Sequence, residues 1–173
     1  MEYDVLLSML EKREFKELKD ELENMHPVDI VEMLEDGLEY GKIDKRQMIL
    51  LFRLLAKEEA AEVFTDMTSD TREVLINALT DSELEEVMEE MYLDDTVDVL
   101  EEMPANVVKK ILANASPETR RDINHLLRYP EDSAGSIMTV EYVDLKENLT
   151  VDEAIARIRK IGVDSETINI CYV

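Results

Sequence analysis

The chain has 173 residues, which suits one domain or one domain with a small addition, and its apolar fraction of 45% is enough for a packed core. A net charge of −23 argues against nucleic-acid or anionic-membrane binding, which needs Lys/Arg surfaces. The charge favours cations or a basic partner, and the alternative is that it serves solubility alone. The lone cysteine, Cys171, excludes an internal disulfide, and no apolar run approaches the ~20 residues of a membrane span.

The first 25 residues carry apolar side chains at helical spacing, and we predict two short helices there with a charged turn between them. The pair His26-Pro27 interrupts the pattern, because the residue before a proline avoids the α conformation. A third helix is expected to follow and to end near Gly37, with Gly37 and Gly41 on either side of a loop.

A repeat of about 12 residues runs from Glu58 to Ala115. Each unit places apolar residues at i, i+1 and i+4, which is one stripe of an amphipathic helix. Helices this short are marginal alone in water, so they must stack on their neighbours as a short α-solenoid. The polar pairs expected to cap these helices are Ser69-Asp70, Asp81-Ser82 and Asp94-Asp95.

The pattern changes in the last third of the chain. Ser116-Pro117 is typical of a helix start and opens a helix over residues 116–127. A short strand is expected at 140–145, a helix opened by a capping box over 150–162, and a second strand at 168–172. A β-α-β piece of this size cannot cover both faces of its sheet, so we expect the chain to be a fragment of something longer.

Residues that carry familiar catalytic chemistry are sparse. Four glycines cannot build a phosphate-cradling loop. His26 and His125 are about 100 residues apart without a second histidine at helical spacing, which favours capping or packing over ligation. Cys171 has no basic neighbour in sequence, which favours burial over nucleophilicity. The sequence therefore does not predict an enzyme.

Carboxylates remain as candidate ligands. The repeat places Glu62, Glu86 and Asp98 at one register position, just before the apolar pair of each unit. Asp94 and Asp98 are four residues apart, so they share a helix face and repel each other unless a cation or basic group lies between them. Mg²⁺ accepts one or two carboxylates plus waters. Spacing alone leaves two readings open: a cation site, or an N-cap at Asp94 with a solvated Asp98.

Two stretches resemble the cytosolic N domain of MgtE-type magnesium transporters. Residues 93–103, LDDTVDVLEEM, resemble its recurring unit. Residues 128–139, RYPEDSAGSIMT, resemble the linker that leads into the first cystathionine-β-synthase-like (CBS) domain of that family, with Ser136 in place of the usual second glycine. His26–Ile30 and Glu59–Phe64 fit the same N domain. The resemblance covers essentially the whole chain, although plain helical repeats are shared with flagellar motor switch proteins.

The resemblance implies a mainly α fold. Residues 1–128 would form a right-handed superhelical array of short helices, 129–136 a linker, and 137–173 a truncated first CBS domain, an incomplete β-α-β piece. The partners it implies are a CBS pair and a transmembrane domain, both absent here, in a homodimer of the full-length chain. The fragment would then be a soluble domain at the cytoplasmic face of the cell membrane.

The resemblance also implies that this part senses intracellular Mg²⁺. Ions that bridge acidic residues of the N and CBS domains would hold a compact state that closes the pore. The matching metal positions here are Glu62, Asp94 and Asp98, with Gly135 offering a backbone carbonyl. The CBS carboxylates that would complete these sites lie beyond Val173, so half-sites are expected. The alternative is a helical-repeat interaction scaffold without metal function, as in motor switch proteins; the linker and the β-α-β tail favour the first reading.

Overall fold

The computed structural model describes residues 3–130, 133–163 and 165–173, so Glu131 and Asp132 of the expected linker lie outside the described residues. The chain divides into two compact units, which we describe separately: an array unit of residues 1–91 and 99–115, and a second unit of residues 92–98 and 116–173. Within the described ranges, no helix combines the length and the apolar character needed to cross a membrane.

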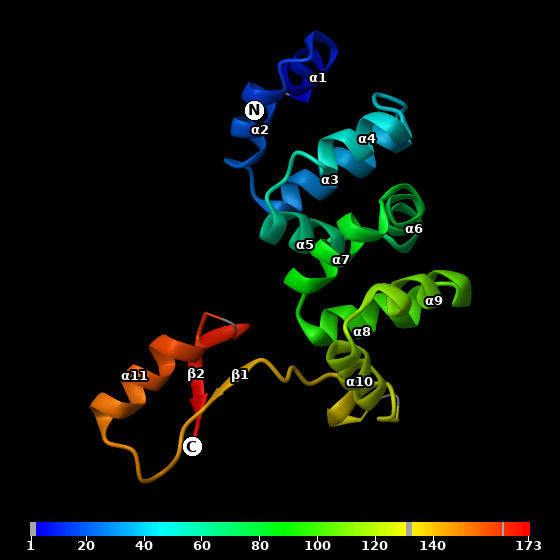
Figure 1. Ribbon diagram of the computed structural model, residues 1–173. Coiled ribbons are helices and arrows are strands. Elements are labelled where there is room, and N and C mark those ends of the chain that lie inside the picture. The colour runs from blue at the N-terminus through cyan, green and yellow to red at the C-terminus, as the bar shows by residue number, and fades with distance from the viewer. Residues whose placement is uncertain (1–2, 131–132, 164) are drawn as a thin grey trace. The chain divides into compact units, whose positions relative to one another are not determined.

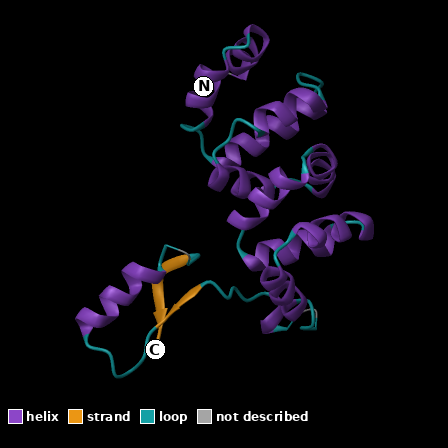
Figure 2. Ribbon diagram, viewed as in Figure 1, coloured by secondary structure: helices purple, strands orange, loops and turns teal. Residues whose placement is uncertain are grey.

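The elements are mostly short helices, as the repeat predicts (Figures 1 and 2). In chain order they are α1 (Tyr3–Lys12), α2 (Phe15–Leu22), α3 (Pro27–Glu39), α4 (Lys45–Phe52), α5 (Lys57–Asp66), α6 (Ser69–Ala78), α7 (Asp81–Glu90), α8 (Leu93–Glu102), α9 (Ala105–Asn114), α10 (Pro117–Leu126), the 3₁₀ turn η1 (Ala134–Ser136), β1 (Tyr142–Asp144), α11 (Val151–Ile161) and β2 (Thr167–Tyr172).

The N-terminal segment forms the two predicted helices. α1 and α2 bury Leu6, Leu10, Leu18 and Leu22, which are at most 6% exposed. The turn between them places Arg13 in the left-handed region, with φ of 61°. The spacing of the apolar residues therefore determines where both helices form and which face of each helix is buried.

The third helix ends two residues after Gly37, close to the predicted position, but Gly37 itself does not end it. α3 continues to Glu39, and Gly37 is a buried residue inside the helix. The Gly37 carbonyl accepts hydrogen bonds from the amides of Lys42 and Ile43, at 2.8 and 3.0 Å. The chain turns at Gly41 instead, where φ is +66°, a conformation that costs glycine little. Gly37 and Gly41 therefore do not bracket a loop.

From α3 onward, helices of the array unit pack on the one after next: α3 contacts α5, α5 contacts α7 and α7 contacts α9 (Figure 1). The predicted apolar stripes form the core between them. Most of these side chains are almost completely buried, and Val63, Phe64, Leu75, Ile76 and Ile111 are 0% exposed. Stacking by alternate helices gives these ten-residue elements the burial that they need to be stable.

The capping residues lie one position earlier than predicted. Ser69 and Asp81 are the first residues of α6 and α7, and the N-caps are Thr68 and Thr80. Thr80 accepts a hydrogen bond from the amide of Glu83 and forms a capping box with it. Acids inside the first turn still interact favourably with the helix dipole, so they remain useful at the position they occupy.

Side chains from other helices complete the start of α6. Glu35 of α3 accepts hydrogen bonds from the amide and the hydroxyl of Thr68, both at 2.7 Å. Glu102 accepts from the Ser69 hydroxyl at 2.7 Å and pairs with the buried guanidinium of Arg72. Acidic groups at a helix N-terminus are stabilising. Here they also link α3 and α8 to the start of α6 by hydrogen bonds.

The second unit contains the predicted β-α-β piece (Figure 2). β1 and β2 pair in parallel, with Val143 opposite Cys171, and α11 is the crossover between them. Thr150 caps α11 in a capping box with Glu153, as predicted. The sheet is thinly covered: Val143 is fully buried, whereas α11 contributes no buried residue.

Candidate metal-binding site

The first turn of α8 carries the predicted acids. Asp94 is the second residue of the helix, so the reading of Asp94 as an N-cap was wrong. Asp98 follows one turn later on the same helix and is exposed. The spacing prediction therefore holds in its geometric part: the two residues lie one turn apart on one helix.

A glutamate from a distant segment completes this helix start. The Leu93 amide donates a hydrogen bond to Oε1 of Glu141, at 3.1 Å, across 48 residues of sequence. Thr139 donates from its hydroxyl to Oε2 of Glu141 at 3.3 Å, and the Glu141 carbonyl accepts the amide of Glu166 at 2.9 Å. Glu141 directly precedes β1, and Glu166 directly precedes β2. Sequence reasoning missed Glu141, since no local pattern relates it to α8.

Asp94 has a partly buried carboxylate. Its Oδ1 is buried and has no hydrogen-bond partner among the described residues. Burial raises the pKa of Asp94 above its ordinary value, the amides of Asp94 and Asp95 oppose this, and the charges of Glu166 and Glu141 raise the pKa further. The charge on a carboxylate oxygen is destabilised when the oxygen is desolvated, lacks a hydrogen bond and lies next to two acids. A cation bound there would stabilise that charge.

Glu62 belongs to the array unit, where it is exposed on α5. Its neighbour Glu59 has a buried Oε2 without a hydrogen-bond partner in the described part of the chain. Burial raises the pKa of Glu59, a backbone hydrogen bond at Ala56 lowers it, and the charges of Glu23 and Glu62 raise it. Acidic side chains therefore crowd together here as well, and the three-residue spacing of Glu59 and Glu62 was the sequence signal for it.

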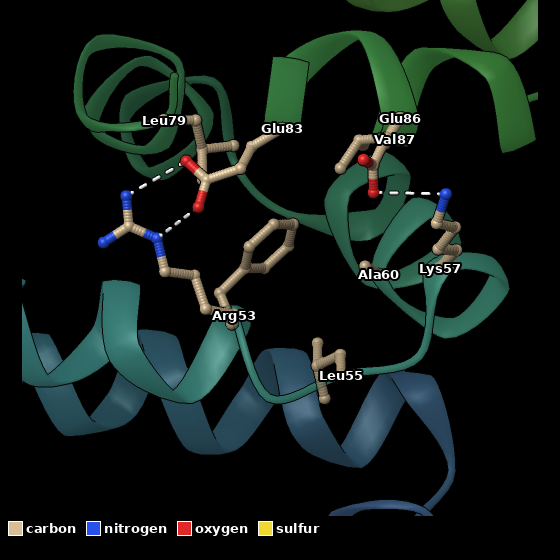
Figure 3. A pocket seen from close by; sticks show the side chains of 9 residues that line it. Arg53, Leu55, Lys57, Ala60, Leu79, Glu83, Glu86 and Val87 are labelled. Atoms are coloured by element: carbon tan, nitrogen blue, oxygen red, sulfur yellow. Dashed lines mark hydrogen bonds and ion pairs between the residues drawn. The ribbon is translucent and has the colours of Figure 1, made fainter. Parts of the chain in front are cut away.

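Glu86, which shares the repeat position of Glu62 and Asp98, has a different environment. Its Oε2 pairs with Lys57 Nζ at 3.2 Å, on one side of a pocket of about 130 Å³ (Figure 3). On the other side Arg53 donates two hydrogen bonds to the Glu83 carboxylate, from Nε to Oε1 at 2.7 Å and from Nη2 to Oε2 at 3.1 Å (Figure 3). Both acids already have cationic partners, so this pocket is not a cation site. Its apolar lining is Phe52, Leu55, Ala60, Leu79 and Val87.

Gly135 lies in η1, at a point of close packing. A Cβ at this position would overlap the ring of Tyr129, so any larger residue would force that ring to move. The Tyr129 ring also meets His125 edge to face, with centroids 5.6 Å apart. Ser136, which replaces the expected second glycine, donates from its hydroxyl to the Ser133 carbonyl at 2.9 Å. The role of the Gly135 carbonyl as a ligand stays a prediction.

Within the described ranges, no group of three or more His, Cys, Asp or Glu side chains is placed to enclose a metal ion. The start of α8 instead offers the buried oxygen of Asp94 and the exposed Asp98, and these hard oxygen ligands suit a Mg²⁺ ion that keeps several waters. Asp94, Asp98 and Gly135 belong to the second unit and Glu62 to the array unit. The half-site with Glu62, Asp94, Asp98 and Gly135 stays a prediction.

The sequence comparisons point to one family. Residues 25–132 match the model of the MgtE intracellular N domain. The magnesium transporter MgtE of Thermus thermophilus is 33% identical over 172 residues, which cover 97% of this chain and 37% of that protein. The magnesium transporter MgtE of Bacillus subtilis is 22% identical over 161 residues, which cover 93% of this chain and 34% of that protein. The chain therefore spans little more than a third of these relatives.

Solved structures agree in fold. The cytosolic domain of the Mg²⁺ channel MgtE in complex with ATP matches with a TM-score of 0.86 and 30% identity, over 99% of this chain and 68% of that one. The soluble part of a magnesium transporter matches with a TM-score of 0.80 and 27% identity, over 99% of this chain and 65% of that one. The predicted mainly helical fold with a small sheet is confirmed.

Proposed function

The chain belongs to the MgtE intracellular N-domain family, and we propose that it is the Mg²⁺-sensing, cytosolic regulatory part of a magnesium transporter or channel. One observation supports this most: the unbonded, buried Oδ1 of Asp94 beside the charges of Glu141 and Glu166. A divalent cation stabilises such a carboxylate more than it stabilises a solvated one. Burial has already removed water from the oxygen, so little hydration is lost when the cation binds, and the charge–charge attraction is less screened.

The proposed mechanism is charge neutralisation. Without a cation, the acids at the start of α8 repel one another, within a chain of net charge −23. Mg²⁺ ions bound at Asp94 and Asp98, and other ions bound at Glu62, attract further carboxylates of the CBS region, and the compact state so formed favours the closed pore. When the Mg²⁺ concentration falls, repulsion returns and the compact state loosens. Mg²⁺ is in this account a regulatory ligand of the domain and the cargo of the whole transporter.

Thermal unfolding in MgCl₂ and in NaCl of equal ionic strength tests the proposal. At a concentration about tenfold above the dissociation constant, Mg²⁺ should stabilise the wild type by about 1.4 kcal/mol beyond NaCl, which is about 3 °C for a chain of this size. Asp98→Ala and Asp94→Asn should each lose most of this excess. Glu89→Gln, which removes one exposed charge on α7, is the matched control and should keep it.

Equal shifts in MgCl₂ and NaCl would contradict metal sensing, because general screening acts on any surface this acidic. The chain would then be better described as a helical-repeat scaffold without metal function. The pocket beside Arg53 and Lys57, with its apolar lining and paired charges, would be the first surface to examine for that alternative.

A further inference from the structure

The start of α8, like that of α6, receives a hydrogen-bond acceptor from a glutamate far away in the sequence. α7 and α11 use their own preceding threonines, Thr80 and Thr150, in capping boxes. α8 is preceded by Tyr92, which lacks the short polar side chain of usual N-caps. The acceptor for the Leu93 amide is instead Glu141, from the segment that leads into β1. The Leu93 amide is one of the helix-start donors without an acceptor inside the helix, and Glu141 supplies one.

Glu141 is itself held by its surroundings. The Thr139 hydroxyl donates to Oε2 of Glu141, and the Glu141 amide donates back to the same hydroxyl oxygen, both at 3.3 Å. The Glu141 carbonyl accepts the Glu166 amide, which joins the lead-in segments of both strands. A shift of β1 or β2 would therefore move the Glu141 carboxylate, which accepts the hydrogen bond from the Leu93 amide of α8.

The same carboxylate contributes charge at Asp94. The acidic groups around Asp94 are Glu141 and Glu166 from the strand side, with Asp95 and Asp98 on its own helix. Glu141 thus combines two functions that substitutions can separate. It accepts a hydrogen bond that fixes the first turn, and it adds negative charge that attracts a cation to the unbonded oxygen of Asp94.

We propose that Glu141 is a positioning residue, which sets the geometry and charge of the Asp94 end of α8 and couples residues 137–173 to it. The part of this inference that concerns Mg²⁺ rests on the proposed function. The positioning role concerns the protein without Mg²⁺ and is tested separately.

The experiment compares Glu141→Ala, Glu141→Gln and wild type by NMR. Glu141→Ala should speed hydrogen exchange of the Leu93 amide by about tenfold, since its acceptor is gone. Glu141→Gln keeps an acceptor oxygen, so exchange of the Leu93 amide should stay within about twofold of wild type. Glu147→Gln, an exposed acid in the loop after β1, is the matched control and should leave this exchange unchanged.

Unchanged Leu93 exchange in Glu141→Ala would overturn the positioning role. So would a Glu141→Gln variant in which Leu93 exchanges as fast as in Glu141→Ala, or a Glu147→Gln variant with an increase of the same size as Glu141→Ala. A subsequent Mg²⁺ titration should show at least about fivefold weaker binding to Glu141→Gln than to wild type. If the wild type does not respond to Mg²⁺, the proposed function fails, while the exchange of the Leu93 amide still decides the role of Glu141.

Discussion

At the scale of single residues, the account depends on how much the negative charge of Asp94 changes the free energy of unfolding when no cation is bound. Asp94 gains from the positive end of the α8 dipole, a contribution of about 0.5 kcal/mol at such positions. It loses through burial of an unbonded oxygen, which costs about 1–3 kcal/mol, and through repulsion by Glu141 and Glu166. The unfavourable contributions are larger, so the charge on Asp94 reduces the stability of the metal-free protein.

Asp94→Asn should therefore leave the metal-free protein at pH 7 as stable as wild type or about 0.5 kcal/mol more stable. Because the folded pKa of Asp94 is raised above its ordinary value of 3.8, the group stabilises the fold below that pH and loses this contribution as pH rises through the folded pKa. The advantage of the variant should vanish below about pH 4. Urea unfolding from pH 3 to pH 7 measures it; a variant that is less stable at pH 7 by about 1 kcal/mol would refute the account.

At the scale of elements, the helices of the array are joined by charged side chains that reach the ends of their neighbours. Arg53, the C-cap residue of α4, donates to the Ala78 carbonyl at the end of α6 and forms a two-bond pair with Glu83 of α7. Glu83 is also the third residue of the α7 capping box with Thr80. These interactions lower the pKa of Glu83 to about 2, with the Arg53 hydrogen bond as the main cause.

Glu83→Gln should destabilise the protein by about 1 kcal/mol at pH 7, a modest value because the pair is partly exposed to solvent. Glu83→Ala should cost about 2 kcal/mol, since it also removes the capping box. The folded pKa is depressed, so the stability that Glu83 contributes is present above 4.5 and is lost as pH falls toward 2. Glu86→Gln is the control, and urea unfolding should show a loss below about 0.5 kcal/mol for its single exposed pair.

An equal loss in the Glu83 and Glu86 variants would show that the Arg53 junction has no special role. A gap between wild type and Glu83→Gln that stays constant down to pH 2 would contradict the assigned pKa.

Periodicity made the helices predictable, since the apolar stripes of α5, α6, α7 and α9 depend on local spacing alone. Contacts across the repeats were not predictable in this way. The pairing of Glu86 with Lys57 depends on a side chain 29 residues away, and the Glu141 cap depends on one 48 residues away. Gly37 misled the prediction because a buried glycine inside a helix and a glycine that ends one look alike in sequence.

At the scale of the whole molecule, the parts of the chain differ in how much apolar surface they bury. The array unit buries the stripes of its repeats, whereas apolar side chains of α11 and β2 remain largely exposed: Ile155 41%, Ile168 54%, Ile170 61% and Tyr172 60%. Local unfolding is easiest where few apolar contacts are lost. Residues 137–173 should therefore open far more often than the array.

Trypsin provides a matched comparison, because a dibasic pair lies within a helix in each part. Cleavage at Arg159-Lys160 of α11 should be at least about tenfold faster than at Lys109-Lys110 of α9, since α11 has no buried residue and α9 is held by Val107 and Ile111. Mass spectrometry of timed digests measures both rates. Equal rates would show that the β-α-β piece is as well anchored as the array.

The central claim is that the acids at the start of α8 bind a divalent cation, and paramagnetic Mn²⁺, used as a substitute for Mg²⁺, tests it most directly. In ¹H–¹⁵N NMR spectra with substoichiometric Mn²⁺ and about 0.15 M NaCl to screen diffuse attraction, the account predicts that amides of residues 93–98 broaden first, followed by 139–141 and Glu166. Excess Mg²⁺ should reverse the broadening, and Asp94→Asn should weaken it. Uniform broadening across the acidic surface, or broadening that begins elsewhere and is unaffected by Asp94→Asn, would contradict the claim.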